Sequence, residues 1–356
     1  MKVLALTRYS AKGASSRIRT LQYIDALRAR GIDVDVQSLF DDHYLTRLYA
    51  GQSVDWRAML GRFLDRLRMR SQLGRYDVVW LEKEALPWLP DGAERWLLSG
   101  GPPLLVDYDD AIFHRYGEHR NPVVRRLLGT KIDRVMRRAR IVTAGSPYLA
   151  ERARAVGAAE VELLPSAVDV DRYRANGHVR DGFVVGWIGT PQTARFLLGI
   201  RDALKAFTSV RTNVRFVFIG CPTGLDLGIP YVARAWSEAT EATEVAEFDC
   251  GIMPLPDEPF ERGKCGYKLV QYMACGVPLI ASPVGVNTEI VTPRENGYVA
   301  RTSDEWRTAL EALAADPVDA ARLGRNGRQR AEANYSTRVV LPRLEALLRR
   351  AANGGG

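Results

Sequence analysis

Short apolar runs alternate with longer amphipathic stretches along most of this chain. The runs are bounded by glycine, proline or polar positions, as buried strands are. The stretches between them place apolar residues three and four positions apart, as helices do. In the first half we predict strands at Lys2–Thr7, Ile32–Leu39, Tyr76–Leu81, Pro103–Tyr108, Arg140–Ala144 and Val161–Leu164. This alternation predicts a parallel sheet with helices on both faces.

The same pattern restarts after residue 181. A first strand at Gly182–Ile188 precedes the loop Gly189–Thr193, and later strands are predicted at Val214–Gly220, Phe248–Met253 and Val277–Ala281. We therefore predict an α/β fold of two Rossmann-like domains, at residues 1–175 and 176–335. The last segment, residues 336–356, is predicted to be an amphipathic helix with a glycine tail.

Composition places the chain among ordinary globular proteins. Hydrophobic residues make up 46% and charged residues 26% of its 356 positions. No apolar run approaches the ~18–20 residues of a membrane span, and the first residues lack the apolar core of a signal peptide. We therefore expect a cytoplasmic protein. Its four cysteines lack a Cys-x-x-Cys spacing and its four histidines are scattered, so we expect reduced thiols and no metal site.

Positive charge is concentrated in the first half. Lys and Arg outnumber Asp and Glu by 30 to 22 over residues 1–180, and the two totals are equal at 20 over the rest. Much of this excess lies in residues 56–76 and 119–140. In the first stretch, apolar residues at helical spacing among arginines indicate a basic amphipathic helix over Arg57–Arg75, which can bind an anionic membrane surface. The alternative is the solvated face of an ordinary packed helix. Neither stretch matches a nucleic-acid-binding module, so we expect no nucleic-acid partner.

In each half, a glycine-rich loop follows the first strand. These loops lie at residues 13–16 and 186–190. Small residues at such loops allow a ligand to approach the backbone closely, and the following helix N-terminus favours phosphate. Neither loop has the Gly-x-Gly-x-x-Gly spacing of a dinucleotide site. This argues against a simple NAD enzyme.

The strongest local signal for a ligand lies in residues 260–281. A glycine-rich turn precedes a predicted helix, Tyr267–Ala274, and Lys264 and Lys268 stand at its entrance. Cations at a helix N-terminus oppose the helix dipole, so a bound diphosphate would give a reason for their presence. The alternative is a pair of surface lysines beside a tight turn.

Residues 266–291 resemble the donor-binding region of the family 4 glycosyltransferases, which have the GT-B fold. In that family a Glu-x7-Glu pair leads into a pattern similar to Glu-Ala-Met-Ala-x-Gly-x-Pro. Residues 271–278 (QYMACGVP) match this pattern, with Gln271 in place of the second Glu and Gly263 in place of the first. A Gln carbonyl can accept the hydrogen bond from the nucleotide ribose, as the family's Glu does. Gly263 cannot contact the sugar, so either Lys264 or Glu261 takes that role or the sugar is held differently.

The resemblance covers about residues 1–350 and is most specific in the second half. It implies the GT-B architecture, in which two Rossmann-like domains face each other across a deep cleft and a C-terminal helix crosses back to the N-terminal domain. The first domain would bind the acceptor and the second the nucleotide sugar. The implied donor-binding residues are Gly189, Thr190, Thr193, Arg195, Gly266, Tyr267, Gln271, Val286, Asn287, Thr288 and Glu289. The implied acceptor-binding residues are Gly13, Ala14, Ser15, Ser16, Arg17 and Arg19.

Carboxylates follow the predicted strand that ends at Tyr108. Our interpretation is that Asp110 or His114 orients the acceptor hydroxyl, while Asp107 and Asp109 pair with the arginines of the Gly13 loop or cap it. The alternative is a capped loop with solvated acids. Lysines near the donor phosphates, with Arg195, would stabilise the leaving diphosphate. The catalytic candidates are Asp110, His114, Lys264 and Lys268, and residues 82–84 are a further candidate group.

The resemblance implies a retaining glycosyltransferase that moves a sugar from a nucleoside-diphosphate sugar to a glycan or lipid-linked glycan in bacterial cell-surface polysaccharide synthesis. Retention would follow from same-face attack with the leaving phosphate as base. We expect neither a cofactor nor a metal, and we expect peripheral contact of the basic first half with the inner face of the cytoplasmic membrane. Two alternatives stay open: a GT-B sugar-nucleotide epimerase, and a non-catalytic sugar-nucleotide-binding protein, which the missing Glu pair would suit.

Overall fold

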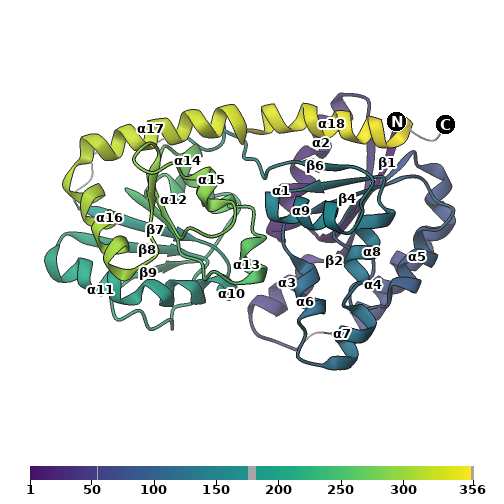
Figure 1. Cartoon of the computed structure of the whole chain (residues 1–356), viewed down its shortest axis with the longest axis horizontal. Coiled ribbons are helices and arrows are strands. Elements are labelled where there is room, and N and C mark those ends of the chain that lie inside the picture. The colour runs from purple at the N-terminus through teal and green to yellow at the C-terminus, as the bar shows by residue number, and fades with distance from the viewer. Residues whose placement is uncertain (54, 175–181, 354–356) are drawn as a thin grey trace. The chain divides into compact units, whose positions relative to one another are not determined.

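The computed structural model describes residues 1–53, 55–174 and 182–353, which form two compact units (Figure 1). Unit 1 comprises Met1–Ser166, Gly263–Cys265 and the chain from Val340 onward. Unit 2 comprises Ala167–Arg262 and Gly266–Val339. The predicted boundary at residues 175–176 falls outside the described residues.

Unit 1 contains a parallel six-stranded sheet in the order β2-β1-β3-β4-β5-β6, as the alternating pattern predicts. Val3 of the central strand β1 lies opposite Val34 on one side and Val78 on the other. Strands β3, β4 and β5 are buried along their whole length because helices cover both faces of the sheet. The elements are β1 Lys2–Tyr9, α1 Ala14–Arg19, η1 Leu21–Tyr23, α2 Ile24–Ala29, β2 Asp33–Phe40, α3 Asp42–Tyr49, α4 Trp56–Arg68, η2 Met69–Arg75, β3 Val78–Glu82, α5 Asp91–Leu98, β4 Leu104–Tyr108, α6 Ile112–Gly117, α7 Pro122–Leu128, α8 Lys131–Arg138, β5 Ile141–Ala144, α9 Pro147–Ala155 and β6 Val161–Leu163.

Unit 2 repeats this architecture with a parallel sheet in the order β12-β11-β10-β7-β8-β9. Alternate residues of β7 enter two different cores: Val184 and Ile188 pack in one, Val185 and Trp187 in the other. Helices α14 and α17 cover the first face, and α11 and α16 cover the second (Figure 1). The elements are β7 Phe183–Ile188, α10 Pro191–Ala194, η3 Arg195–Ile200, α11 Arg201–Val210, β8 Val214–Ile219, β9 Val232–Arg234, α12 Glu241–Val245, β10 Cys250–Met253, α13 Pro259–Arg262, α14 Tyr267–Ala274, β11 Leu279–Ala281, α15 Asn287–Ile290, β12 Gly297–Val299, α16 Ser303–Ala315 and α17 Pro317–Asn334.

The last helix, α18 Thr337–Asn353, belongs to unit 1 from Val340 onward. There Arg350 pairs with Glu162 at the end of the sheet at 2.7 Å, and Glu345 pairs with Arg30 at 2.9 Å. These bonds attach the end of the chain to the unit that contains its beginning. Among the helices of the described residues, none is both long and apolar enough to cross a membrane.

Candidate functional site

The loop after β1 in unit 1 is fixed by close packing and buried hydrogen bonds. A Cβ on Gly13 would lie 2.3 Å from the Cβ of Tyr9, so a side chain at this position would clash. Ser16 donates from its hydroxyl to Glu82 and accepts from the backbone N–H of Tyr9. Of the predicted acceptor-binding residues, Ala14 is exposed and Ser15 is half-buried, whereas the others are buried.

Arg19 is a structural residue of this loop. Its guanidinium forms a bidentate pair with Asp107, at 2.6 and 2.9 Å, and donates to the backbone carbonyl of Leu164. Burial disfavours the charge on Arg19, but the Asp107 carboxylate outweighs it and raises the pKa of Arg19. This confirms the predicted pairing of Asp107 with an arginine of the Gly13 loop.

Asp109 pairs with a lysine that lies outside the Gly13 loop. Its carboxylate lies 2.6 Å from Nζ of Lys83 and accepts a hydrogen bond from Ser15. Nζ of Lys83 also donates to Ser15 at 2.8 Å and lies 3.6 Å from Asp110. Lys83 is a non-glycine residue with φ of 63°, a left-handed conformation that costs energy and aims the side chain into this cluster.

Asp110, the predicted hydroxyl-orienting residue, lies between two lysines. One carboxylate oxygen is 3.3 Å from Nζ of Lys264 and the other is 3.6 Å from Nζ of Lys83. Burial alone would raise the pKa of Asp110, but the two ammonium groups outweigh it and lower this pKa. Asp110 is therefore ionised and able to accept a hydrogen bond from a hydroxyl.

Lys264, which we predicted with Lys268 at the donor phosphates, belongs to unit 1 and pairs with Asp110. The reason is local packing: Gly263 approaches so closely that a Cβ would lie 2.5 Å from the Cβ of Ala111, and Cys265 contacts the backbone of Asp109. The glycine at the position of the family's first Glu is therefore required by this contact.

His114, the other hydroxyl-orienting candidate, already has both ring nitrogens in hydrogen bonds. Nδ1 lies 2.7 Å from Glu118, and Nε2 lies 2.7 Å from the hydroxyl of Tyr148. An acceptor hydroxyl would have to displace one of these partners, so Asp110 is the better placed of the two.

Lys83, Ser15, Asp109 and Asp110 form a polar cluster. Glu82 and Glu84, on either side of Lys83, are buried and extend this cluster into the interior. Burial raises the pKa of Glu82, and one of its oxygens finds no hydrogen-bond partner among the described residues. Glu84 is bound by Arg8 and by Lys131, which is fully buried and also contacts Glu94 at 3.2 Å. The sequence signal for this group is a run of charged residues directly after a buried strand.

In unit 2, the loop after β7 lies against a tryptophan. A Cβ on Gly189 would lie 2.4 Å from the ring of Trp187, and Thr190 and Thr193 form a capping box at the start of α10. Nζ of Lys268 lies 5.5 Å from the centre of the same Trp187 ring, in a cation–π contact. The predicted residues Gly189 and Lys268 therefore meet at one ring, whereas Arg195 is exposed and stacks on Phe196.

Helix α14 begins after a glycine, as the sequence predicts. Gly266 adopts a left-handed φ of 65° as the N-cap residue and supplies no side-chain cap to the first turn. A Cβ at Gly266 would lie 2.3 Å from Ile290 and 3.3 Å from Val286. A third loop, which contains the predicted donor-binding residues 286–289, therefore lies at the same place. Backbone N–H groups and Lys268 are what a diphosphate would need there.

Gln271 lies deeper than its predicted role suggests. It is buried on α14, and its amide donates to the hydroxyl of Tyr173 at 2.9 Å, which in turn donates to Glu241. Tyr267 is half-buried. In the third loop Asn287 is buried and donates to the carbonyl of Ser282, whereas Thr288 and Glu289 are exposed.

No group of three or more His, Cys, Asp or Glu side chains within the described ranges is arranged to hold a metal ion. In each unit the candidate residues lie in loops at the carboxyl ends of the parallel strands. The predicted donor-binding residues lie in unit 2, and the predicted acceptor-binding residues lie in unit 1.

Comparison with known proteins finds similarity to glycosyltransferases. Residues 182–316 match the family model for glycosyl transferases group 1. The chain is 22% identical over 278 residues to TuaH of Bacillus subtilis, named as a teichuronic acid biosynthesis glycosyltransferase, which covers 69% of this chain and 65% of that protein. It is 36% identical over 85 residues to a GDP-mannose-dependent monoacylated alpha-(1-6)-phosphatidylinositol monomannoside mannosyltransferase of Corynebacterium glutamicum, covering 23% and 22% of the two chains. The chain thus spans less than two thirds of either relative's length.

Solved structures show the fold. Sucrose-phosphate synthase from Thermosynechococcus elongatus superposes with a TM-score of 0.72 at 17% identity over 98% of both chains. HepE from Anabaena, in complex with UDP and glucose, gives a TM-score of 0.69 at 18% identity over 98% of this chain and 99% of that one. The chain therefore has the GT-B fold, and its residues 182–316 match the glycosyl transferases group 1 model.

Proposed function

We propose that this protein is a retaining glycosyltransferase of family 4 that moves a sugar from a nucleoside-diphosphate sugar to a glycan or lipid-linked glycan in bacterial cell-surface polysaccharide synthesis. The observation that carries the proposal is the family match over residues 182–316, which contains every predicted donor-binding residue. The name of TuaH, a teichuronic acid biosynthesis glycosyltransferase, supports the polymer class.

Unit 2 would bind the donor through its diphosphate. The dipole of helix α14 and the charge of Lys268 would stabilise a leaving diphosphate. The structure of HepE contains UDP, whereas the Corynebacterium glutamicum relative is named as GDP-mannose-dependent. The nucleotide base of the donor is therefore the first property to measure. Thermal unfolding with UDP, GDP, dTDP and CDP tests this, because a ligand at 100 times its Kd adds about 2.7 kcal/mol. Stabilisation by NAD alone would overturn the proposal.

Retention of anomeric configuration is the mechanistic part of the proposal. The leaving phosphate would take the proton of the attacking hydroxyl on the same face of the sugar, while ionised Asp110 orients that hydroxyl. NMR of the first product reads the anomeric configuration directly. An inverted product would exclude this mechanism.

The acceptor would be presented at an anionic membrane surface. On α4, Trp56, Leu60 and Leu64 form an apolar stripe that is 61%, 53% and 45% exposed, and Arg57 stacks on Trp56 at 5.3 Å. Burial of each such side chain in a membrane is worth about 1.5–3 kcal/mol. Not every basic residue of the two stretches is available, because Arg66 and Lys131 are buried.

Co-sedimentation with anionic vesicles at low salt tests the membrane contact. We expect wild type to bind, Leu60→Glu to lose most of the binding, and Val318→Glu, which changes an even more exposed apolar residue in unit 2, to keep it. Equal binding of the two variants would refute the role of the α4 stripe.

A further inference from the structure

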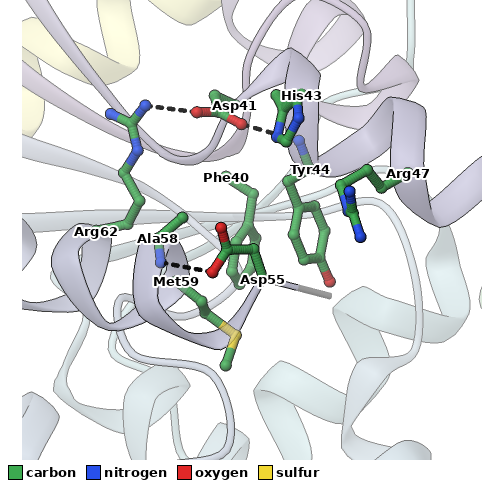
Figure 2. A pocket seen from close by; sticks show the side chains of 9 residues that line it. All are labelled: Phe40, Asp41, His43, Tyr44, Arg47, Asp55, Ala58, Met59 and Arg62. Carbon is green, nitrogen blue, oxygen red and sulfur yellow. Dashed lines mark hydrogen bonds and ion pairs between the residues drawn. The ribbon is translucent and has the colours of Figure 1, made fainter. Parts of the chain in front are cut away.

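A pocket in unit 1 contains none of the predicted catalytic, donor-binding or acceptor-binding residues. It opens at the carboxyl end of β2, between α3 and the beginning of α4 (Figure 2). Its lining combines apolar side chains with two acidic and three basic residues, counting His43. Concave sites with an apolar wall and a few fixed polar groups are typical of small-molecule binding.

The apolar wall is a rigid aromatic pair. The rings of Phe40 and Tyr44 stack with centroids 4.4 Å apart and an interplanar angle of 18°. Phe40 is buried and is held from its other sides by Tyr9, at 5.9 Å, and Phe63, at 6.2 Å. Tyr44 is half-buried and borders the opening (Figure 2). A ligand therefore meets a flat aromatic surface that is already fixed.

The polar rim offers both acceptors and donors. Asp41 accepts from the backbone N–H of Tyr44 at 2.9 Å and pairs with Arg62, and Asp55 accepts from the backbone N–H of Ala58 at 3.2 Å. The Tyr44 hydrogen bond, with Arg62, lowers the pKa of Asp41 and keeps it ionised. Arg47 is anchored to the carbonyl of Ser53. A carboxylate accepts up to about four hydrogen bonds and a guanidinium donates five, so each group has capacity left for a ligand.

This combination selects one ligand chemistry. The carboxylates of Asp41 and Asp55 balance the charges of Arg47 and Arg62, so the rim lacks the excess of positive charge that favours a phosphate group. The charged rim would also make burial of an acyl chain costly. A sugar ring has an apolar face for the aromatic wall and hydroxyls that both donate to carboxylates and accept from guanidinium groups. We infer that this pocket binds one sugar residue of the acceptor glycan.

The pocket is connected to the loop that carries the predicted acceptor residues. Asp42, the first residue of α3, accepts from the hydroxyl of Ser10 and from the backbone N–H of Lys12, and Nζ of Lys12 bonds Thr46 at 3.0 Å. Strands β1 and β2 are neighbours in the sheet. The bound sugar would thus be a unit other than the one that receives the new linkage, and the inference rests in this respect on the proposed function.

The test uses Tyr44→Ala, with Tyr49→Ala as a matched control. Tyr49 lies on the same helix, is 38% exposed and is not part of the pocket lining. The probes are three disaccharides: maltose, N,N′-diacetylchitobiose and α-1,6-mannobiose. Their binding to the full chain is measured by saturation-transfer NMR. We expect wild type and Tyr49→Ala to transfer saturation to at least one disaccharide, and Tyr44→Ala to reduce the signal at least fivefold. Arg62→Gln provides a second variant on the exposed rim, with a reduction of threefold or more, should Tyr44→Ala fail to fold.

Two outcomes would overturn the inference: no disaccharide receives saturation, or the signal persists in both pocket variants. Binding of inorganic phosphate or anionic vesicles that depends on Tyr44 would also overturn it, because the pocket would then take an anion. The nucleotide panel separates this inference from the proposed function. Nucleotide binding without disaccharide binding would refute only the inference that the pocket binds a sugar. Tyr44-dependent disaccharide binding without nucleotide binding would refute the proposed glycosyltransferase function.

Discussion

Lys83→Met is the sharpest test of the polar cluster in unit 1, because it removes a buried ammonium group and keeps a side chain of similar length. Nζ of Lys83 lies 2.6 Å from Asp109, 3.6 Å from Asp110 and 2.8 Å from the Ser15 hydroxyl. The Lys83 side chain is 5% exposed and that of Asp109 is 15% exposed, so water can replace little of this contact.

Breaking a buried ion pair by removing one partner costs about 3–5 kcal/mol. We take the lower end, about 3 kcal/mol, because Asp110 is 29% exposed and keeps Lys264. For a unit of this size that corresponds to a fall in Tm of roughly 6–12 °C. Lys83→Gly should cost about 1 kcal/mol less than Lys83→Met, because glycine adopts the left-handed φ without strain.

The effect of pH provides an independent check. The pKa of Asp110 is lowered, so its ion pairs add stability above its ordinary value of 3.8 and lose it as the pH falls through the lower folded-state pKa. Removal of Lys83 reduces this lowering, so the difference between wild type and Lys83→Met should shrink below about pH 4. Transfer should fall at least tenfold, whereas nucleotide affinity should stay unchanged because Lys83 belongs to unit 1.

Thermal and urea unfolding measure the stability change, and Lys83→Met/Asp109→Asn is the matched double variant. Removing the second charge should recover part of the loss. If Lys83→Met unfolds at the wild-type midpoint at pH 7, the cluster is solvated in solution and the argument from buried charge fails.

Three further predictions follow from individual contacts. Lys268→Ala should weaken nucleoside-diphosphate binding about 10–100-fold with little change in Tm, measured by calorimetry, because it removes a charge-assisted hydrogen bond; unchanged affinity would make Lys268 a surface lysine. Gly189→Ala should destabilise unit 2 by about 1–3 kcal/mol in thermal unfolding, because its Cβ would overlap the Trp187 ring; a wild-type midpoint would show that the ring moves freely. Lys131→Met should cost about 3–5 kcal/mol in urea at pH 7. Burial raises the pKa of Glu94, so this carboxyl destabilises the fold less when it is protonated. The free energy of unfolding lost in Lys131→Met should therefore decrease toward acid pH. A loss that does not depend on pH would contradict the argument.

The pattern along the chain predicted most of the fold. Long buried strands such as β1 and β7 give continuous apolar runs, and Gly266 and Gly276 bound helix α14 as the glycine positions indicated. The edge strands β9 and β12 were not predicted, because each has three residues and neither lies in a longer apolar run, unlike β11, which was predicted from Val277–Ala281.

The candidate site was predicted less completely. The sequence indicated charged residues after strands, but it could not indicate that Lys264 pairs with Asp110, 154 positions away, or that Gln271 is buried against Tyr173. Equally, nothing local distinguishes the buried Arg66, which donates to the carbonyls of Thr7 and Gln37, from the exposed Arg57 on the same helix.

The sequence by itself thus determined the two parallel sheets, the positions of the glycine turns and the edge of each sheet that carries polar groups. These properties depend on spacing within one segment, since strand and helix periods are local. Only the tertiary structure decided which charges meet, which become buried and where an aromatic pocket forms beside β2. Those outcomes depend on the order of strands in each sheet, which places side chains distant in sequence within hydrogen-bonding distance of one another.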